Sequence, residues 1–167
     1  WMAVALTAIL LMAVGGAIGT VSVRQESANV YDLYFVERNL RAASGGDALR
    51  AEERALSGGA DSTAQQAEAL MAELLKGPVD QTLKSPFPKG TGLNSVEQKG
   101  TEIHVDFSAV YGTLSGMDLT LADYAVTMTL AQLPDVARVR ITVAGNNLDY
   151  RSRQVFLIRD ILFAPKE

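Results

Sequence analysis

The sequence contains no cysteine and only one histidine, His104. The absence of cysteine excludes disulfide bridges, thiolate zinc sites, cysteine nucleophiles and iron–sulfur clusters, as well as the acylated cysteine of a bacterial lipoprotein. A zinc site needs three or four His, Cys or carboxylate ligands, and a Ser–His–acid triad could use only His104. The sequence therefore predicts no catalytic residues, no metal and no cofactor, and we expect the protein not to be an enzyme.

Positive charge is scarce as well. The chain has 15 Lys and Arg against 19 Asp and Glu, which gives a formal net charge of -4. Proteins that bind nucleic acid need a basic face to neutralise phosphates, so no nucleic-acid partner is expected. The 167 residues are 48% hydrophobic and 20% charged. These values are typical of one ordinary globular domain.

Charged residues are missing altogether from Trp1 to Val23, and the first charge is Arg24. A helix rising ~1.5 Å per residue over this run would cross a hydrocarbon core of ~30 Å. Two interpretations compete, a transmembrane anchor and a signal peptide cleaved near Gly16 to Thr20. We prefer the anchor because no clear small-x-small cleavage site follows, and the length of the run disfavours a buried core helix. The rest of the chain is then expected on the extracytoplasmic side of the cell membrane, or secreted if the segment is cleaved.

The remainder of the sequence reads as a short linker and one domain. Residues 24–29 are polar and suit a linker that leaves the membrane. Residues 30–163 carry the alternating and helical hydrophobic patterns of a folded domain. Residues 164–167 form a C-terminal tail.

The first half of this domain predicts strands followed by a helix. Val30 to Val36 is rich in β-branched and aromatic residues and predicts a strand. Ala48 to Leu56 suits a second strand or a helix equally. Ser62 and Gln65 have the spacing of a capping box. Apolar residues then recur at helical spacing until Gly77-Pro78, which ends the helix because proline has no N–H.

The second half predicts a hairpin, a helix and a strand. Leu93 to Gln98 and Thr101 to Phe107 are joined by Lys99-Gly100 as a tight turn. After a loop, Thr120 and Asp123 are expected to cap a helix that runs to about Leu133. Val136 to Val143 alternates apolar and polar residues, as a strand with one wet face does. This order predicts an α+β fold with one small antiparallel or mixed sheet and two helices packed on one of its faces.

A few polar residues could carry chemistry, but each has a simpler interpretation. His104, Asp106 and Glu102 lie on the outward side of their strand. We expect a solvated surface histidine and an Asp106 carboxylate that bonds to the N–H groups of its own turn. Glu52 to Arg54 reads as a solvated face or as an edge strand protected by charge. Tyr111, Tyr124 and Tyr150 are too dispersed in the sequence to form a stacking platform, so we expect them at core or rim positions.

The passage from Val105-Asp106-Phe107-Ser108 to Gly145 resembles the GerMN domain of spore germination and sporulation proteins. The earlier series of a Tyr-Phe strand, Arg54, Leu75-Lys76-Gly77-Pro78 and Ser85 to Thr91 resembles it too, so the likeness spans about residues 30–163. The resemblance implies a small α/β domain similar to the ring-building motifs of secretion systems. It also implies membrane attachment in endospore-forming bacteria and a role in sporulation or germination.

Two departures from that family pattern are visible. The typical sporulation member is a lipoprotein with two such domains, whereas this sequence has no cysteine and room for one domain. No catalytic residues are carried over from the family.

Three functional hypotheses follow. The first is a non-catalytic module that binds a protein partner or copies of itself, because the sequence has a well-patterned core and no chemical constellation. The second is a module for cell wall or a small ligand, with Val79 to Gly92 and Ser108 to Gly116 forming the mouth of its site. The third is an exported hydrolase that would use Asp106, Glu102 or His104. We prefer the first.

Overall fold

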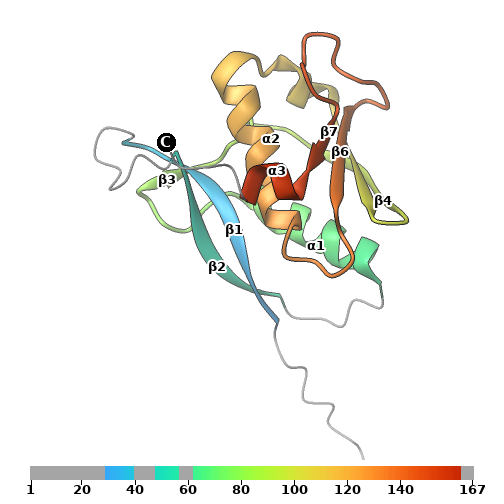
Figure 1. The fold of residues 1–167 in the computed structure, drawn as a ribbon. Helices are drawn as coiled ribbons and strands as arrows, with labels where there is room; N and C mark the ends of the chain where they lie inside the picture. Colours follow the sequence, from blue (N-terminus) through green and yellow to red (C-terminus); the bar gives the residue numbers. More distant parts are fainter. Residues whose placement is uncertain (1–28, 40–47, 57–61, 163–167) are drawn as a thin grey trace, which may run out of the picture.

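The computed structural model describes residues 29–39, 48–56 and 62–162. These residues form an α+β structure with two sheets, one of three strands in the order β2-β1-β3 and one of four strands in the order β4-β5-β6-β7. Figure 1 shows the hairpin of β1 and β2 on one side of α2 and the second sheet on the other. The predicted anchor, the linker up to residue 28 and the tail lie outside the described residues.

The first sheet is built around the aromatic strand. β1 (Asn29–Glu37) pairs antiparallel with β2 (Leu49–Leu56) and, at its far end, with β3 (Leu83–Lys84). Leu33 and Phe35 are fully buried, as the alternation requires. The strand predicted from Val30 to Val36 is therefore confirmed, and it begins one residue earlier, at Asn29. The segment from Ala48 to Leu56, which suited a strand or a helix, forms the edge strand β2.

The helix α1 (Thr63–Lys76) begins and ends where the sequence indicates. The hydroxyl of Ser62 accepts a hydrogen bond from the backbone N–H of Gln65 at 3.2 Å, which satisfies one of the free N–H groups of the first turn. Gly77 follows with φ 86° and ψ 175°, a backbone conformation that is essentially restricted to glycine. The buried side of α1 consists of Ala67, Leu70, Met71 and Leu74.

The second sheet combines a hairpin with a parallel pair of strands. β4 (Leu93–Lys99) and β5 (Glu102–Phe107) are antiparallel, β6 (Arg138–Val143) lies parallel to β5, and β7 (Val155–Leu157) pairs antiparallel with β6. One face of the central strands is fully or almost fully buried; its residues are Ile103, Val105, Phe107, Val139, Ile141 and Val143. The hairpin and the last alternating strand are thus confirmed.

The connection between β5 and β6 differs from its prediction. A 3₁₀ helix, η1 (Ala109–Thr113), replaces the first part of the expected loop, and α2 (Gly116–Leu130) begins at Gly116 with Ser115 at its N-cap. Thr120 and Asp123 therefore lie inside α2 and do not cap it. The capping prediction was wrong because Asp123 is recruited to a buried polar contact rather than to the first turn.

The expectation of a single sheet was also wrong. The free backbone edge of β1 is met by the end of α2 instead of by a strand of the second sheet: Tyr34 N donates to Thr129 Oγ1 at 3.2 Å, and Asp32 N donates to Gln132 Oε1 at 2.8 Å. Side chains thus take the hydrogen bonds that a neighbouring strand would otherwise make. Both sheets and both long helices nevertheless contribute to one hydrophobic core, which includes Leu33, Leu70, Val105, Val126 and Ile141.

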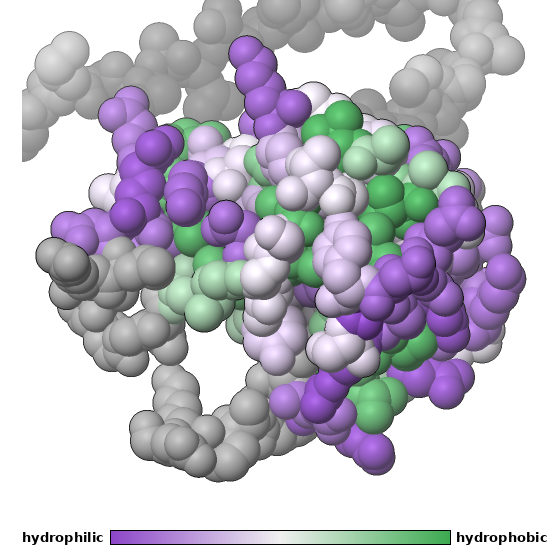
Figure 2. All heavy atoms as spheres, turned by 90° about the horizontal axis from the view of Figure 1, so that it is seen from above, coloured by the Kyte–Doolittle hydropathy of each residue, from purple (hydrophilic) through white to green (hydrophobic). Residues whose placement is uncertain are grey.

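The chain ends its described part with a short helix, α3 (Ile158–Leu162). Figure 2 shows hydrophobic patches separated by hydrophilic side chains on the face seen from above. Among the described residues, the exposed large apolar or aromatic side chains are scattered along the chain; they are Val30, Val79, Met117, Tyr124 and Tyr150.

Candidate functional site

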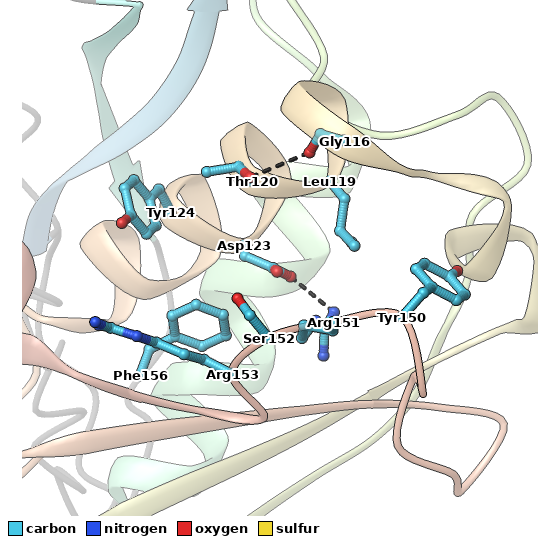
Figure 3. A pocket seen from close by; sticks show the side chains of 10 residues that line it. All are labelled: Gly116, Leu119, Thr120, Asp123, Tyr124, Tyr150, Arg151, Ser152, Arg153 and Phe156. Carbon is cyan, nitrogen blue, oxygen red and sulfur yellow. Dashed lines mark hydrogen bonds and ion pairs between the residues drawn. The ribbon is translucent and has the colours of Figure 1, made fainter.

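A pocket of about 430 Å³ lies between α2 and the segment that leads into β7. Its volume falls within the range of ~300–1,000 Å³ that is usual for small-ligand sites. Figure 3 shows side chains from both elements pointing into it. The lining residues are Gly116, Leu119, Thr120, Asp123 and Tyr124 from α2, and Tyr150, Arg151, Ser152, Arg153 and Phe156 from the facing segment.

A buried polar network forms the floor of this pocket. The hydroxyl of Tyr111 donates to Asp123 Oδ1 at 2.7 Å, and Arg151 Nη2 donates to the same oxygen at 2.8 Å. Arg151 Nη1 donates to the carbonyl of Ile141 at 2.8 Å. The side chains of Asp123 and Arg151 are only 4% and 3% exposed, so this ion pair ties α2 to the segment after β6 in the protein interior.

The surroundings shift the pKa of both acids in the network. Burial raises the pKa of Asp123 to about 6, although the Arg151 guanidinium and the Tyr111 hydroxyl act in the opposite direction. Burial, reinforced by the Asp123 charge, raises the pKa of Tyr111. The phenol therefore keeps its proton and remains the donor to the carboxylate.

Two atoms of the network have no hydrogen-bond partner among the described residues. Arg151 Nε is buried without a partner, and both hydrogen bonds to Asp123 go to Oδ1, which leaves Oδ2 without one. Buried polar atoms are rarely left unsatisfied, and those that are call for a specific explanation such as water or a ligand. Both residues line the pocket, but Arg151 Nε is sealed within the protein, so Asp123 Oδ2 is the atom of this pair that could accept a hydrogen bond from a bound molecule.

Aromatic rings border the same pocket. Tyr124 and Phe156 form an edge-to-face pair with ring centroids 6.4 Å apart, the geometry that aromatic quadrupoles favour. Tyr124 is 38% exposed and Tyr150 is 56% exposed. Tyr111 is instead fully buried and stacks on Phe107 with centroids 4.7 Å apart. The prediction of core and rim positions for the three tyrosines is confirmed, and two of them share one pocket.

Sequence reasoning missed Asp123 and Arg151 as partners. The available signal was Asp123 itself, an acid among Leu121, Ala122, Ala125 and Val126 of an apolar helix. Aspartate is almost never fully buried unless it is paired. Its partner could not be read from the sequence because Arg151 is 28 residues away, in a segment without a clear pattern.

The three polar residues considered for a hydrolase lie together on the outward face of β5. His104 Nε2 is 2.8 Å from Thr142 Oγ1, and that hydroxyl donates to Asp106 Oδ1 at 2.6 Å. Because the hydroxyl has a single proton, Thr142 accepts from His104 Nε2. Glu102 is engaged with Arg140 at 2.9 Å. The histidine is half-buried rather than fully solvated.

Asp106 differs from its predicted role. It is 8% exposed and accepts from Thr142, from the amide of Asn94 at 2.8 Å and from the backbone N–H of Gly145 at 2.8 Å. It therefore fixes the turn after β6 rather than its own turn. Burial acts to raise its pKa, but these hydrogen bonds outweigh it and the pKa of Asp106 is lowered. Asn94 reaches it from an irregularity in the register of β4, as bulges commonly re-aim side chains.

The charged run on β2 does more than protect an edge. Arg54 donates to Glu52 at 2.7 Å and to the carbonyl of Gly77 at 3.0 Å. Glu52 in turn accepts from the backbone N–H groups of Val79 and Asp80. Burial acts to raise the pKa of Glu52, but the hydrogen bonds from Asp80, Val79 and Arg54 outweigh it, so the pKa is lowered. The edge position is confirmed, and the side chains also hold the chain that leaves α1.

The two segments predicted to border a ligand site, Val79 to Gly92 and Ser108 to Gly116, both contribute residues to a smaller pocket. A second pocket of about 220 Å³ lies between the proline-rich segment and the start of α2. Lys84 to Pro88 line one side of it, and Leu114 and Asp118 line another. The two predicted loops do come together, although the larger pocket lies elsewhere.

Two further features are absent from the part of the chain that the structure describes. No cluster of three or more His, Cys, Asp or Glu side chains there is arranged to hold a metal ion. No described helix has the length and hydrophobicity to span a bilayer. Residues 1–23 lie outside that part.

Comparison with known proteins then places the domain. The family model named Germane, described as sporulation and spore germination, matches residues 32–149. A comparison with curated protein sequences gave no match.

Solved structures share the fold. The first GerMN domain of the Bacillus subtilis sporulation protein GerM is 24% identical with a TM-score of 0.54, covering 72% of this chain and 86% of that one. A predicted lipoprotein from Clostridium perfringens is 19% identical with a TM-score of 0.55, covering 81% and 91%. The tandem GerMN domains of B. subtilis GerM give 19% identity and a TM-score of 0.59, and 80% of this chain covers 48% of that pair.

Proposed function

Since the chain belongs to the Germane family of sporulation and spore germination domains, we propose that it acts in sporulation or germination as a non-catalytic, membrane-attached module outside the cytoplasm. Its task is to bind a protein partner or further copies of itself. The uncharged run from Trp1 to Val23 supports the membrane attachment. The similarity in fold to a predicted lipoprotein and to GerM domains is consistent with an exported protein.

The observation that carries the binding proposal is the outward face of the second sheet. It presents charges of both signs from three strands; they are Glu97, Lys99, Glu102, Arg138 and Arg140. Glu97 and Lys99 on the edge strand β4 are 55% and 70% exposed. An edge strand offers unpaired backbone groups, and alternating charges favour a partner of complementary pattern.

Site-specific photo-crosslinking in intact membranes tests this proposal. A crosslinking residue at Glu97 is expected to give a defined adduct, either a dimer of this chain or one partner. The same residue at Glu68, exposed on α1, serves as the control and is expected to give none. High salt is expected to reduce the adduct, because exposed ion pairs are screened. A chain that stays monomeric and free of adducts from positions on this face would contradict the proposal.

A second candidate function is binding of cell wall or of a small ligand. The specific observation in its favour is the pocket itself, which is bordered by aromatic rings and by a carboxylate oxygen, Asp123 Oδ2, that receives no hydrogen bond from the described residues. Co-sedimentation of the protein with purified peptidoglycan tests it directly. Retention in the pellet supports it, and complete recovery in the supernatant opposes it.

A further inference from the structure

We propose that the pocket between α2 and residues 150–156 binds an uncharged sugar ring of a glycan. This inference deepens the second candidate function by naming the ligand class and the site. It is independent of the sheet face assigned to protein binding, because no residue of that face lines the pocket.

The charges of the pocket favour an uncharged ligand. Asp123 and Arg151 neutralise each other at 2.8 Å. Arg153 lies 3.9 Å from Asp160 at the rim, so its charge is also opposed. A phosphate or carboxylate ligand would meet the Asp123 carboxylate, and an amine would meet two guanidinium groups. A neutral polar molecule avoids both repulsions.

The hydrogen-bonding groups suit neighbouring hydroxyls. Asp123 Oδ2 receives no hydrogen bond from the described residues and is an available acceptor. The hydroxyls of Thr120 and Ser152 lie on the same lining. Thr120 already donates to Gly116, which leaves its oxygen as an acceptor, and a serine hydroxyl can donate or accept. Adjacent hydroxyls of a sugar present a donor and an acceptor side by side, so one ring could bond Asp123 Oδ2 and a hydroxyl of the lining.

The aromatic rim supplies the other half of sugar recognition. The C–H face of a pyranose ring is apolar and packs against an aromatic ring, which provides a large contact area with few degrees of freedom. Tyr124 and Tyr150 are partly exposed at this pocket, and Phe156 supports Tyr124 from the side. Figure 3 shows Tyr124 and Tyr150 on opposite sides of the Asp123–Arg151 pair.

Saturation-transfer difference NMR tests the proposal with the purified full chain in a detergent without a sugar headgroup. The probes are the β-1,4-linked trisaccharide of N-acetylglucosamine, cellotriose and maltotriose. Benzoate and spermidine serve as an anionic and a cationic probe. Transfer to the ring protons of at least one trisaccharide, with none to the charged probes, is expected. Absence of transfer to all three sugars overturns the proposal.

A pair of variants locates the site. Tyr124→Ala removes an aromatic wall and is expected to weaken sugar binding about 3- to 10-fold. Met117→Ala is the matched control, because Met117 is 70% exposed on the same helix and outside the lining. Circular dichroism shows whether both variants keep the fold. Equal affinities for both variants would place any sugar binding elsewhere and overturn the assignment. A chain that crosslinks from Glu97 but binds no sugar would refute this inference alone.

Discussion

Tyr111 and Asp123 meet through an O–H···O hydrogen bond of 2.7 Å in the protein interior, one from the 3₁₀ helix η1 and one from α2. The ring of Tyr111 is held in place from the other side by Phe107 of β5, at a centroid distance of 4.7 Å. The hydroxyl is thus positioned by aromatic packing and the carboxylate by a helix. This contact joins the apolar core to the polar floor of the pocket.

Removal of that hydroxyl should destabilise the protein. Tyr111→Phe keeps the stacked ring but deletes a hydrogen bond to a buried charged group, so we expect a loss of about 1.5–3 kcal/mol in the free energy of unfolding. Urea denaturation at neutral pH measures it. Tyr150→Phe is the control, because Tyr150 donates to the carbonyl of Gly112 at an exposed site, and we expect about 1 kcal/mol or less. Equal losses would contradict the buried role.

The stability of the fold should depend on pH through Asp123. Its pKa is about 6 in the folded protein against the ordinary 3.8, so between these values the folded state binds more protons than the unfolded state. The stabilising contribution of Asp123 to the free energy of unfolding is therefore fully present below about pH 4 and is lost as the pH rises through about 6.

Comparison of the wild type with Asp123→Asn isolates that contribution. Relative to the variant, which does not titrate here, the wild type should lose on the order of 1–3 kcal/mol between pH 4 and pH 7. Urea denaturation across this range gives the difference. A constant difference between the two proteins would show that Asp123 titrates near its ordinary pKa.

The backbone at the end of α1 should require glycine. Gly77 has φ 86° and ψ 175°, so Gly77→Ala is expected to reduce stability by about 1–3 kcal/mol through strain alone, since no atom lies within 4 Å of the added Cβ. Gly92→Ala is the matched control. Its Cβ would meet Ser108 at 3.7 Å, an ordinary contact, and its φ is not positive. Thermal unfolding of both variants compares them, and a harmless Gly77→Ala would contradict the strain.

The Arg54 side chain should contribute more than its position on an edge strand indicates. It contacts Glu52, Glu73 and the carbonyl of Gly77 and is 18% exposed. Arg54→Ala is expected to cost about 1–3 kcal/mol because it removes the partly buried ion pair with Glu52 and the side-chain donor to the carbonyl of Gly77.

The control for Arg54 is Arg159→Ala. Arg159 is 78% exposed and, among the residues that the structure describes, pairs only with Asp160, at 3.6 Å. Its removal should therefore change stability by less than about 0.5 kcal/mol. Chemical denaturation gives both values. If both substitutions lowered the free energy of unfolding by similar amounts, Arg54 would contribute no more than an exposed surface charge.

Local patterns predicted most elements but not their neighbours. The alternation in Ile103, Val105 and Phe107 identifies the buried face of a strand, and Ser62 identifies the start of a helix, because both signals act over a few residues. The same alternation says nothing about which strands pair. The division into two sheets depends on the contacts of Tyr34 and Asp32 with the end of α2, which are 95 and 100 residues distant.

The candidate site shows the same limit in a sharper form. Tyr124 and Tyr150 were expected at core or rim positions, without a distinction between the two, and their common pocket arises only when residues 150–156 fold back over α2. Arg151 looks like any surface arginine in the sequence until its buried position beside Asp123 is known. A tertiary contact, and not propensity, decides the role of each.

The reciprocal pair of hydrogen bonds between the backbone of Asp32 and the side chain of Gln132 has a consequence for how the molecule is made. Gln132 both accepts from Asp32 N at 2.8 Å and donates to Asp32 O at 2.6 Å. During synthesis the hairpin of β1 and β2 emerges early, but its remaining edge stays unprotected until residue 132 has followed. Contacts of such long range form slowly, so newly made chains pass through a period in which that edge can pair with another copy.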